Sequence, residues 1–310
     1  MVTTEIAEKI QQLEEKYAAM GQNLSSYLDG LLYADYLTYW DYIQLDVLLN
    51  LQHPRTPFPD ESIFIMYHQI TELYFKLSLK AIEQVCHAPE LTVEIFKTQV
   101  KRVNNYFKSL ISSFEIMVDG MEKEQFLKFR MALLPASGFQ SGQFRMIEIC
   151  STSLPNLVYE AQREELKGKG LKETLDQIYW RSGATELATG KKTLTLRQFE
   201  LKYMETFLKT AQQYEVNNMQ LRYQQLMPEE QQEVKPLLRE YDMNINVRWP
   251  LMHYKSAVRY LHKKPEDIAA TGGTNWQQFL PPKNKRIVFF PELWTEEELN
   301  NWGKVAMEEE

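Results

Sequence analysis

The stretch DESIFIMYHQITELYFK, residues 60–76, carries the clearest helical pattern in the chain. Its apolar residues recur at spacings of three, four and seven, which is the period of a helix with one buried face. They are Ile63, Phe64, Tyr67, Ile70, Tyr74 and Phe75. An acidic residue before such a run is a common N-cap. We therefore predict a long helix over residues 61–86, capped by Asp60.

The same period continues on both sides of this stretch, so helices are expected along most of the chain. Further helical candidates are 91–118, 122–133, 143–151, 156–182, 196–225 and 228–262, together with apolar stripes around Ile6–Tyr17 and Tyr42–Leu49. Only RIVFF, residues 286–290, resembles a strand, and one strand builds no sheet. We predict an all-α fold: a single helical domain over residues 1–310, built around a helix bundle, with an N-terminal arm at about 1–30 and a flexible loop at about 181–195.

Composition limits the functional class. The 310 residues include only 12 glycines and 13 prolines, few enough to favour long helices. The net charge of −7 argues against an extended nucleic-acid or anionic-membrane surface, so neither partner is expected. There is no apolar run of membrane-spanning length and no signal-peptide pattern at the start. Cys86 and Cys150 lack a CxxC partner, as in cytoplasmic proteins with reduced thiols.

Two of the five histidines are candidates for chemistry. His53 precedes a proline, His87 ends a helix and His262 precedes two lysines, so these three are set aside. His68 shares a helix face with an aromatic residue four positions earlier, although a histidine at the edge of the core is the commoner explanation. His253 faces an apolar stripe, as a haem ligand would. An ordinary buried histidine gives the same pattern, and spacing alone favours that reading.

Two further elements could bind an amino-acid substrate. Phe126 and Arg130 are four residues apart on one predicted helix face, where a guanidinium can grip a carboxylate in bidentate fashion. An arginine lying over the helix surface is the simpler interpretation, and the pattern alone favours it. The glycine pair in TGGTNW, residues 271–276, permits a loop that folds over a ligand. Such glycine pairs also form plain turns.

Taken together, six phrases resemble the tryptophan 2,3-dioxygenase family in content and order. They are YADYLTYWDYIQLDVLLNLQHP, DESIFIMYHQITELYFK, FRMALLPASGFQSGQFRMIE, RWPLMHYKSAVRYL, ATGGTNW and FFPELW, and they span roughly residues 25–295. The resemblance implies a cytoplasmic, all-helical homotetramer with a buried pocket for one haem b per subunit. The implied partners are L-tryptophan and O2. The implied reaction inserts both oxygen atoms across the indole 2,3-bond to give N-formylkynurenine, the first step of tryptophan catabolism by the kynurenine pathway.

On the haem side, the resemblance assigns three residues. His253 corresponds to the axial ligand of the haem iron, and is therefore the metal-binding residue. Ser137 and Gly138 correspond to the distal loop close to the haem. The proline of RWP, Pro250, comes three residues before this ligand and is expected to end or kink the helix there.

On the substrate side, His68 corresponds to the distal histidine near the indole nitrogen, the candidate catalytic residue. Phe64 corresponds to the aromatic that packs on the substrate ring, and Arg130 to the arginine that binds the carboxylate. Thr271 corresponds to the threonine near the substrate ammonium and carboxylate. Tyr39 and Tyr42 correspond to tyrosines that a neighbouring subunit is expected to contribute to the pocket.

Two departures from the family pattern keep alternatives open. Phe126 stands where the family usually has a tyrosine, four residues before the arginine, and a missing hydroxyl there could weaken or change substrate binding. The spacing of 18 residues from His253 to Thr271 is longer than expected. The rival hypotheses are a related haem-dependent oxygenase for another indole derivative and a non-catalytic haem-binding helical protein.

Overall fold

The computed structural model describes residues 2–133, 138–186, 189–261 and 280–304. In these ranges the chain is mostly helical and forms no strand, which confirms the all-α prediction. It falls into two compact units, Met1–His53 and Pro54–Glu310, here called the N-terminal unit and the main unit. No described helix is both long enough and apolar enough to cross a lipid bilayer.

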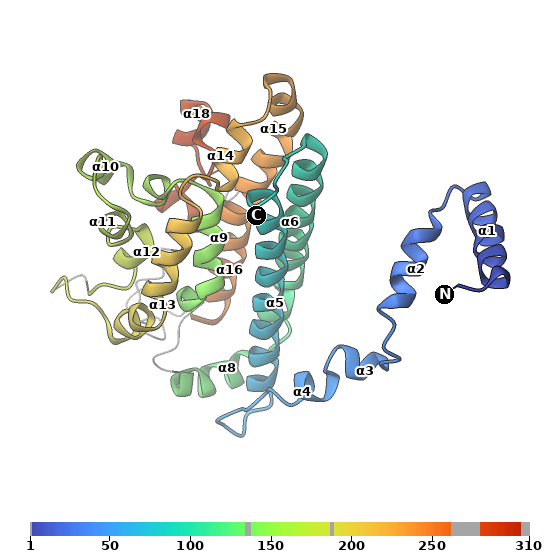
Figure 1. Ribbon diagram of the computed structural model, residues 1–310. Helices are drawn as coiled ribbons and strands as arrows, with labels where there is room; N and C mark the ends of the chain where they lie inside the picture. Colours follow the sequence, from blue (N-terminus) through green and yellow to red (C-terminus); the bar gives the residue numbers. More distant parts are fainter. Residues whose placement is uncertain (1, 134–137, 187–188, 262–279, 305–310) are drawn as a thin grey trace. The chain divides into compact units, whose positions relative to one another are not determined.

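The N-terminal unit contains helices without a core of their own. They are α1 (Thr4–Ala19), α2 (Leu24–Leu32), α3 (Tyr39–Tyr42) and α4 (Leu45–Leu49), drawn in blue in Figure 1. Local capping supports them, since the Asn23 side chain accepts a hydrogen bond from the Ser25 amide at 2.8 Å. Leu24 is the one buried apolar residue among those described in this unit. The apolar stripes predicted from the sequence are therefore exposed in the single chain.

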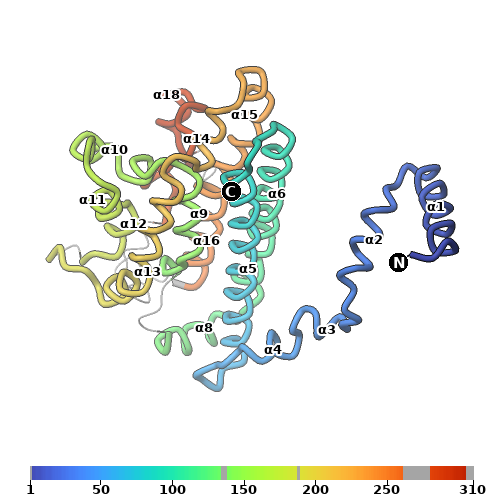
Figure 2. Tube along the Cα trace, viewed as in Figure 1, coloured from blue at the N-terminus to red at the C-terminus, as the bar shows by residue number. Residues whose placement is uncertain are grey.

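The main unit is built around two long helices. Helix α5 (Asp60–Cys86) lies beside α6 (Val93–Ser113), and α9 (Gly142–Ser151) and α15 (Pro228–Met243) pack against this pair (Figures 1 and 2). Fully buried side chains from these helices fill the centre of the unit: Ile82, Val85, Val100, Val103, Phe107, Leu110, Ile147, Leu238 and Tyr241. The 3.6-residue period of the sequence thus places its apolar face where the helices meet.

The start of α5 corrects one prediction. Pro59, not Asp60, is the N-cap, and Asp60 is the first helical residue. Its carboxylate accepts a hydrogen bond from the Glu122 amide at 2.6 Å, which anchors the start of α5 to a distant segment. Glu61 accepts hydrogen bonds from the amides of Arg55 and Thr56, both at 2.8 Å. These contacts hold the proline-rich connection before the helix.

The predicted helix over 156–182 is wrong as a continuous element. The chain forms short pieces instead: η3 (Leu154–Leu157), α10 (Glu160–Arg163), η4 (Glu164–Leu166), α11 (Leu171–Leu175) and α12 (Tyr179–Ser182). Gly168 has a φ of 77°, in the left-handed region, so a right-handed helix cannot continue through it. An isolated bridge between Val158 and Ile178 then brings the two ends of the segment together.

Of the other predicted helices, 143–151 is present as the continuous helix α9, and the rest are present but divided. The segment 91–118 forms α6 and α7 (Glu115–Val118), and 122–133 forms α8 (Lys123–Phe129) and the 3₁₀ turn η1 (Arg130–Leu133). The segment 196–225 forms α13 (Leu194–Gln213) and α14 (Met219–Gln224). Short elements complete the described chain: η2 (Gly138–Gln140), η6 (Pro282–Asn284), η7 (Pro291–Leu293) and α18 (Glu296–Asn300).

Between α15 and α16 (Trp249–Leu261) the helical path continues through one π turn, η5 (Asn244–Arg248). Pro250 was expected to end or kink the helix, because its ring removes one amide donor and crowds the preceding turn. The wider π turn directly before it changes the hydrogen-bond register at that point. The chain therefore keeps its helical course up to His253.

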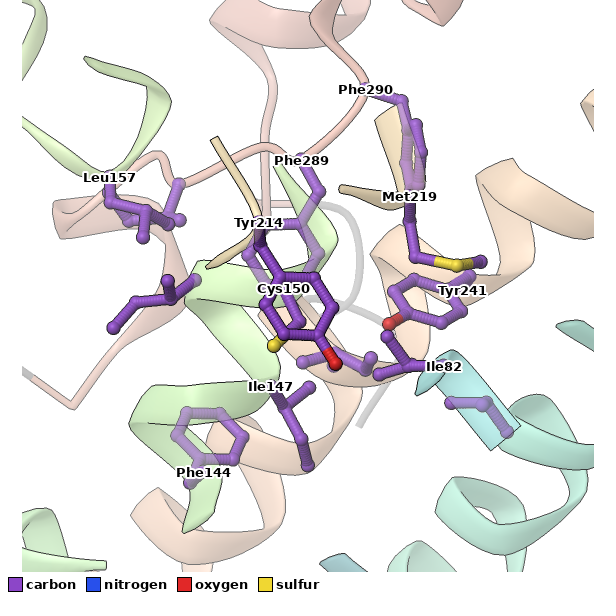
Figure 3. Close-up of a cluster of buried hydrophobic side chains, with 14 of the residues drawn as sticks. Ile82, Phe144, Ile147, Cys150, Leu157, Tyr214, Met219, Tyr241, Phe289 and Phe290 are labelled. Atoms are coloured by element: carbon purple, nitrogen blue, oxygen red, sulfur yellow. The ribbon is translucent and has the colours of Figure 1, made fainter. Parts of the chain in front are cut away.

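Within the described part of the chain, the strand-like stretch RIVFF forms no β-strand and no strand pair. The backbone amides of Phe289 and Phe290 donate instead to the carboxylate of Asp242, at 2.7 and 3.1 Å. Both phenyl rings are buried beside Tyr241 (Figure 3). The buried carboxylate of Asp242 thus accepts the backbone hydrogen bonds that a neighbouring strand would accept in a sheet.

Candidate functional site

An aromatic cluster joins α5, α8 and α16 in the main unit. Its buried members include Tyr67, Phe114, Phe129 and Tyr260, and Phe64, Phe126, Trp249 and Tyr254 pack against them. The predicted site residues His68, Arg130 and His253 come from the elements that form this cluster. Segments far apart in sequence therefore converge on one apolar region, and each candidate can be examined in it.

His68 on α5 is held by the residue one turn before it. Its ring lies 4.1 Å from the Phe64 ring, centroid to centroid, and its Nδ1 is 2.7 Å from the Phe64 carbonyl oxygen. A carbonyl only accepts, so Nδ1 carries the proton and Nε2 of the neutral ring is left as an acceptor. The side chain keeps solvent access, but desolvation by the surrounding protein lowers the pKa of His68. The neutral tautomer is therefore the favoured form at neutral pH.

Arg130 is buried, with 7% of its surface exposed, so the expectation of an arginine lying over the helix surface is wrong. It stands where α8 ends and the 3₁₀ turn η1 begins, and this change of helix type departs from the predicted continuous face. Burial also lowers the pKa of Arg130, although a guanidinium stays charged at neutral pH. A charge placed in such surroundings suits an anionic ligand.

Phe126 lies inside the aromatic cluster. Its ring centroid is 4.6 Å from that of Tyr260 and 6.3 Å from that of Phe64. Phe64 in turn contacts His68, so the Phe64 ring connects Phe126 to the candidate distal histidine. Phe126 is the position where the family usually has tyrosine. The phenyl group adds apolar packing at this place and brings no hydroxyl.

His253 on α16 is a neutral imidazole with an apolar neighbour. Its ring centroid is 6.1 Å from that of Phe114, and burial lowers the pKa of His253 to about 4. Within the described part of the chain, neither ring nitrogen has a hydrogen-bond partner. A Cβ atom on Gly138 would come within 3.0 Å of the ring Cε1 and 3.5 Å of Nε2. A glycine therefore stands against this edge of the ring, where a side chain would press on Cε1.

These features fit an axial haem ligand. Iron binds the unprotonated imidazole nitrogen, and the lowered pKa keeps that lone pair free at neutral pH. The His253 side chain is partly buried, and its ring nitrogens have no partner in the described chain, so one of them is available to a ligand. The two histidines lie on one aromatic cluster: the Tyr67 ring is 6.3 Å from that of His68 and 5.6 Å from that of Phe114, which contacts His253.

A buried polar cluster beside this site was not predicted from the sequence. On α9, Arg145 Nη1 donates to Glu148 at 2.8 Å and to the Tyr179 hydroxyl at 2.8 Å, and that hydroxyl donates to Glu148. Lys285 Nζ lies 5.6 Å from the centre of the Tyr179 ring. The spacing of three between arginine and glutamate was a usable signal. Nothing in the sequence pointed to the lysine.

Four predicted site residues lie outside the described part of the main unit. Ser137 and Thr271 lie outside the described residues. Tyr39 and Tyr42 belong to the N-terminal unit, where their side chains are 70% and 76% exposed. Their proposed contact with a neighbouring subunit's pocket stays a prediction.

Comparison with known proteins gives a consistent result. A family model described as tryptophan 2,3-dioxygenase matches residues 30–264. A protein of that name from Ruegeria sp. (strain TM1040) is 28% identical over 277 residues, covering 85% of this chain and 92% of the relative. The protein of that name from Herpetosiphon aurantiacus is 40% identical over 115 residues, which cover 36% of this chain and 44% of the relative. The one from Dictyostelium discoideum is 36% identical over 136 residues, which cover 40% of this chain and 34% of the relative.

Proposed function

The chain belongs to the tryptophan 2,3-dioxygenase family, and from this premise we propose that it is a haem-dependent dioxygenase acting on L-tryptophan. The proposed reaction inserts both atoms of O2 across the indole 2,3-bond and gives N-formylkynurenine, which opens tryptophan catabolism by the kynurenine pathway. The observation that carries the proposal is the neutral imidazole of His253, whose ring nitrogens have no hydrogen-bond partner in the described chain. This ring contacts Gly138 and shares an aromatic cluster with His68.

In this proposal His253 holds the iron of one haem b per subunit, with Gly138 and Ser137 beside it. When bound, the haem supplies the binding and activation of O2, which is the cofactor's own chemistry. The protein's part is to keep His253 unprotonated and to leave the approach to Nε2 free of side chains. Both conditions are supported by the burial of the ring and by the glycine against it.

His68 is proposed to orient the indole. Its Nε2 is the acceptor left after Nδ1 donates to the Phe64 carbonyl, so it can receive a hydrogen bond from the indole N–H. Indole is far too weak an acid for a neutral imidazole to ionise it, which makes orientation the main role and proton removal secondary. Phe64, whose ring is tilted against that of His68, offers a ring face for the substrate to pack on.

The amino-acid end of the substrate is proposed to bind Arg130. A buried guanidinium is stabilised by a carboxylate that it can grip with two parallel hydrogen bonds. Holding both ends of tryptophan fixes the indole 2,3-bond relative to the haem and lowers the entropic cost of reaction. Thr271 is proposed to assist at the ammonium and carboxylate. Phe126 brings no hydroxyl to this contact.

We further propose that the chain works as a cytoplasmic homotetramer and that residues 1–310 form one functional domain. The N-terminal unit supports this, because its apolar side chains have no core of their own. Leu31, Leu32, Tyr33 and Tyr36 are 70–100% exposed. Such a surface is normally covered by protein. A second copy would cover it and could bring Tyr39 and Tyr42 to a neighbouring pocket.

A related oxygenase for another indole derivative is the second candidate. Phe126 favours it, because the tyrosine hydroxyl usual in the family at that place is absent. Arg130 opposes it, because a buried guanidinium calls for an anionic substrate. A non-catalytic haem protein is the third candidate, and no described residue argues for it.

One experiment separates these functions. Haem-loaded, reduced protein is mixed with L-tryptophan without oxygen, and its Soret band is recorded before O2 is admitted. A histidine-ligated spectrum followed by a product two oxygen atoms heavier than tryptophan supports the dioxygenase. A haem spectrum with one added oxygen, or with turnover only of other indoles, supports the second candidate. Haem binding without any turnover supports the third.

A further inference from the structure

The turn that faces His253 is held by a buried arginine. In η2, a Cβ atom on Gly138 would lie 3.0 Å from Cε1 of the His253 ring, so the backbone and the imidazole approach each other closely. The carbonyl oxygen of the next residue, Phe139, accepts a hydrogen bond from Arg145 Nε at 3.4 Å. Arg145 thus binds the backbone one residue away from the glycine that contacts the candidate haem ligand.

Two groups fix the direction of the Arg145 guanidinium. Its Nη1 donates to a Glu148 oxygen and to the Tyr179 hydroxyl, both at 2.8 Å, and that hydroxyl donates to the other Glu148 oxygen. All three side chains are buried, and the centres of the Phe144 and Trp180 rings lie 5.1 and 5.8 Å from the guanidinium carbon. Glu148 thus balances the Arg145 charge, and Nε is left to reach the turn.

The side chains of the turn are fastened separately, to α13 and the residues that begin it. The Phe139 ring packs edge-on against that of Phe199, with 5.5 Å between the ring centroids. Gln140 Nε2 donates to the Thr195 carbonyl at 3.1 Å. These contacts hold side chains, whereas the Arg145 contact holds the backbone itself. Without the Arg145 contact the turn should therefore stay attached, but its backbone should be free to shift relative to the imidazole.

We propose that Arg145, oriented by Glu148 and Tyr179, is a positioning residue that sets the distance between the glycine turn and the His253 ring. Where haem is concerned this rests on the proposed function, since His253 is the proposed axial ligand. Arg145 acts through the backbone of η2 and takes no part in the reaction. Its effect should appear in the haem affinity and in the surroundings of the imidazole.

A double-mutant cycle on the full-length protein tests this link. Gly138→Ala adds one methyl group against the His253 ring, and because Gly138 is not among the glycines with positive φ, alanine probes the contact alone. Arg145→Lys keeps a positive charge beside Glu148 but cannot reproduce the planar fork of the guanidinium. Haem affinity is measured by titration for the wild type, the two single variants and the double variant.

We expect Gly138→Ala to lower haem affinity roughly tenfold in the wild type, and no more than about threefold beside Arg145→Lys, because a loosened turn can move away from the ring. Arg222→Lys is the matched control. Arg222 also holds backbone carbonyls, those of Val85 at 3.2 Å and Ala88 at 2.7 Å, but at the C-terminal end of α5. Its effect should add to that of Gly138→Ala. Additive effects with Arg145→Lys, or equal coupling with Arg222→Lys, overturn the proposal.

A measurement on the haem-free protein is independent of the proposed function. With ¹³C at Cε1 of its five histidines, His253→Ala identifies the NMR signal of the His253 ring. That signal should shift in Arg145→Lys and stay in place in Arg222→Lys, and an unmoved signal in Arg145→Lys contradicts the positioning role. If Arg145→Lys fails to fold, Tyr179→Phe, which removes one partner of the guanidinium, replaces it in both measurements. Failure of the wild type to bind any haem would refute the proposed function, and the His253 signal would still decide the role of Arg145.

Discussion

Asp242 and His253 lie on opposite sides of one π turn, and the difference between them separates fold from function. Asp242 is fully buried and accepts four hydrogen bonds, from the amides of Phe289 and Phe290 and from the side chains of Trp294 and Asn246. His253 is surrounded by protein too, yet no described residue hydrogen-bonds its ring. The same helical path thus carries one polar group that the chain satisfies completely and one that it leaves available.

This contrast has a physical basis. A buried polar group without a partner costs free energy, so folding alone favours arrangements like that of Asp242. A group like His253 persists where its partner comes from outside the chain. Mutations of Asp242 and its partners should therefore change stability, and mutations around His253 should change ligand binding and turnover. The predictions below test this division, beginning with the largest effect.

His253→Ala should abolish turnover and weaken haem binding at least roughly 100-fold, since losing an outer-shell partner of a ligand already costs 10–100-fold. The haem-free variant should keep its free energy of unfolding within about 1 kcal/mol, because no protein hydrogen bond is lost. Haem titration and urea unfolding of the haem-free protein measure the two quantities. A large loss of stability would show that His253 also holds the fold.

Asp242→Ala should lower the free energy of unfolding by roughly 4 kcal/mol, because it leaves several buried donors without an acceptor. Urea unfolding of the haem-free protein is again the measurement. Asp119→Ala is the matched control, since that carboxylate is 70% exposed in a surface ion pair and should contribute less than about 1 kcal/mol. Equal losses in the two variants would contradict the role given to Asp242.

His68→Ala should lower kcat/KM for L-tryptophan roughly 30-fold, about 2 kcal/mol, the size of one hydrogen bond in a desolvated site. With tryptophan methylated on the indole nitrogen, wild type and variant should differ far less, because that substrate has no N–H to donate. Steady-state kinetics with both substrates provide the comparison. An equal loss with both would assign His68 a role other than binding the indole N–H.

Glu298→Gln should have the smallest effect. Hydrogen bonds from Arg239 and from the Thr295 amide hold the pKa of Glu298 at about 2, below its usual range. Its stabilising contribution is therefore present above the ordinary carboxyl pKa and is lost as the pH falls toward 2. The side chain is 37% exposed, so solvent screening limits the expected loss at pH 7 to roughly 0.5 kcal/mol. The variant and wild type should converge in stability on acidification, and a constant difference from pH 7 to pH 3 would refute the assignment.

Local pattern made much of this molecule predictable. The period of apolar residues predicted the start of α5 to within one residue and its end at residue 86, because a helix face is formed by residues three and four apart in the sequence. It failed over 156–182, where Gly168 at positive φ breaks the helix. It also did not predict that Arg130 is buried, since that position is where α8 ends and η1 begins.

The sequence by itself determined that the chain is helical, that it belongs to its family, and which histidines and arginine to examine, since these depend on residue identity and on short spacings. Tertiary structure alone decided which polar groups are satisfied. Asp242 reaches backbone amides 47 and 48 residues away, and the Lys285 ammonium comes to lie over the Tyr179 ring. Such pairings depend on how separate helices pack, and no local spacing encodes them.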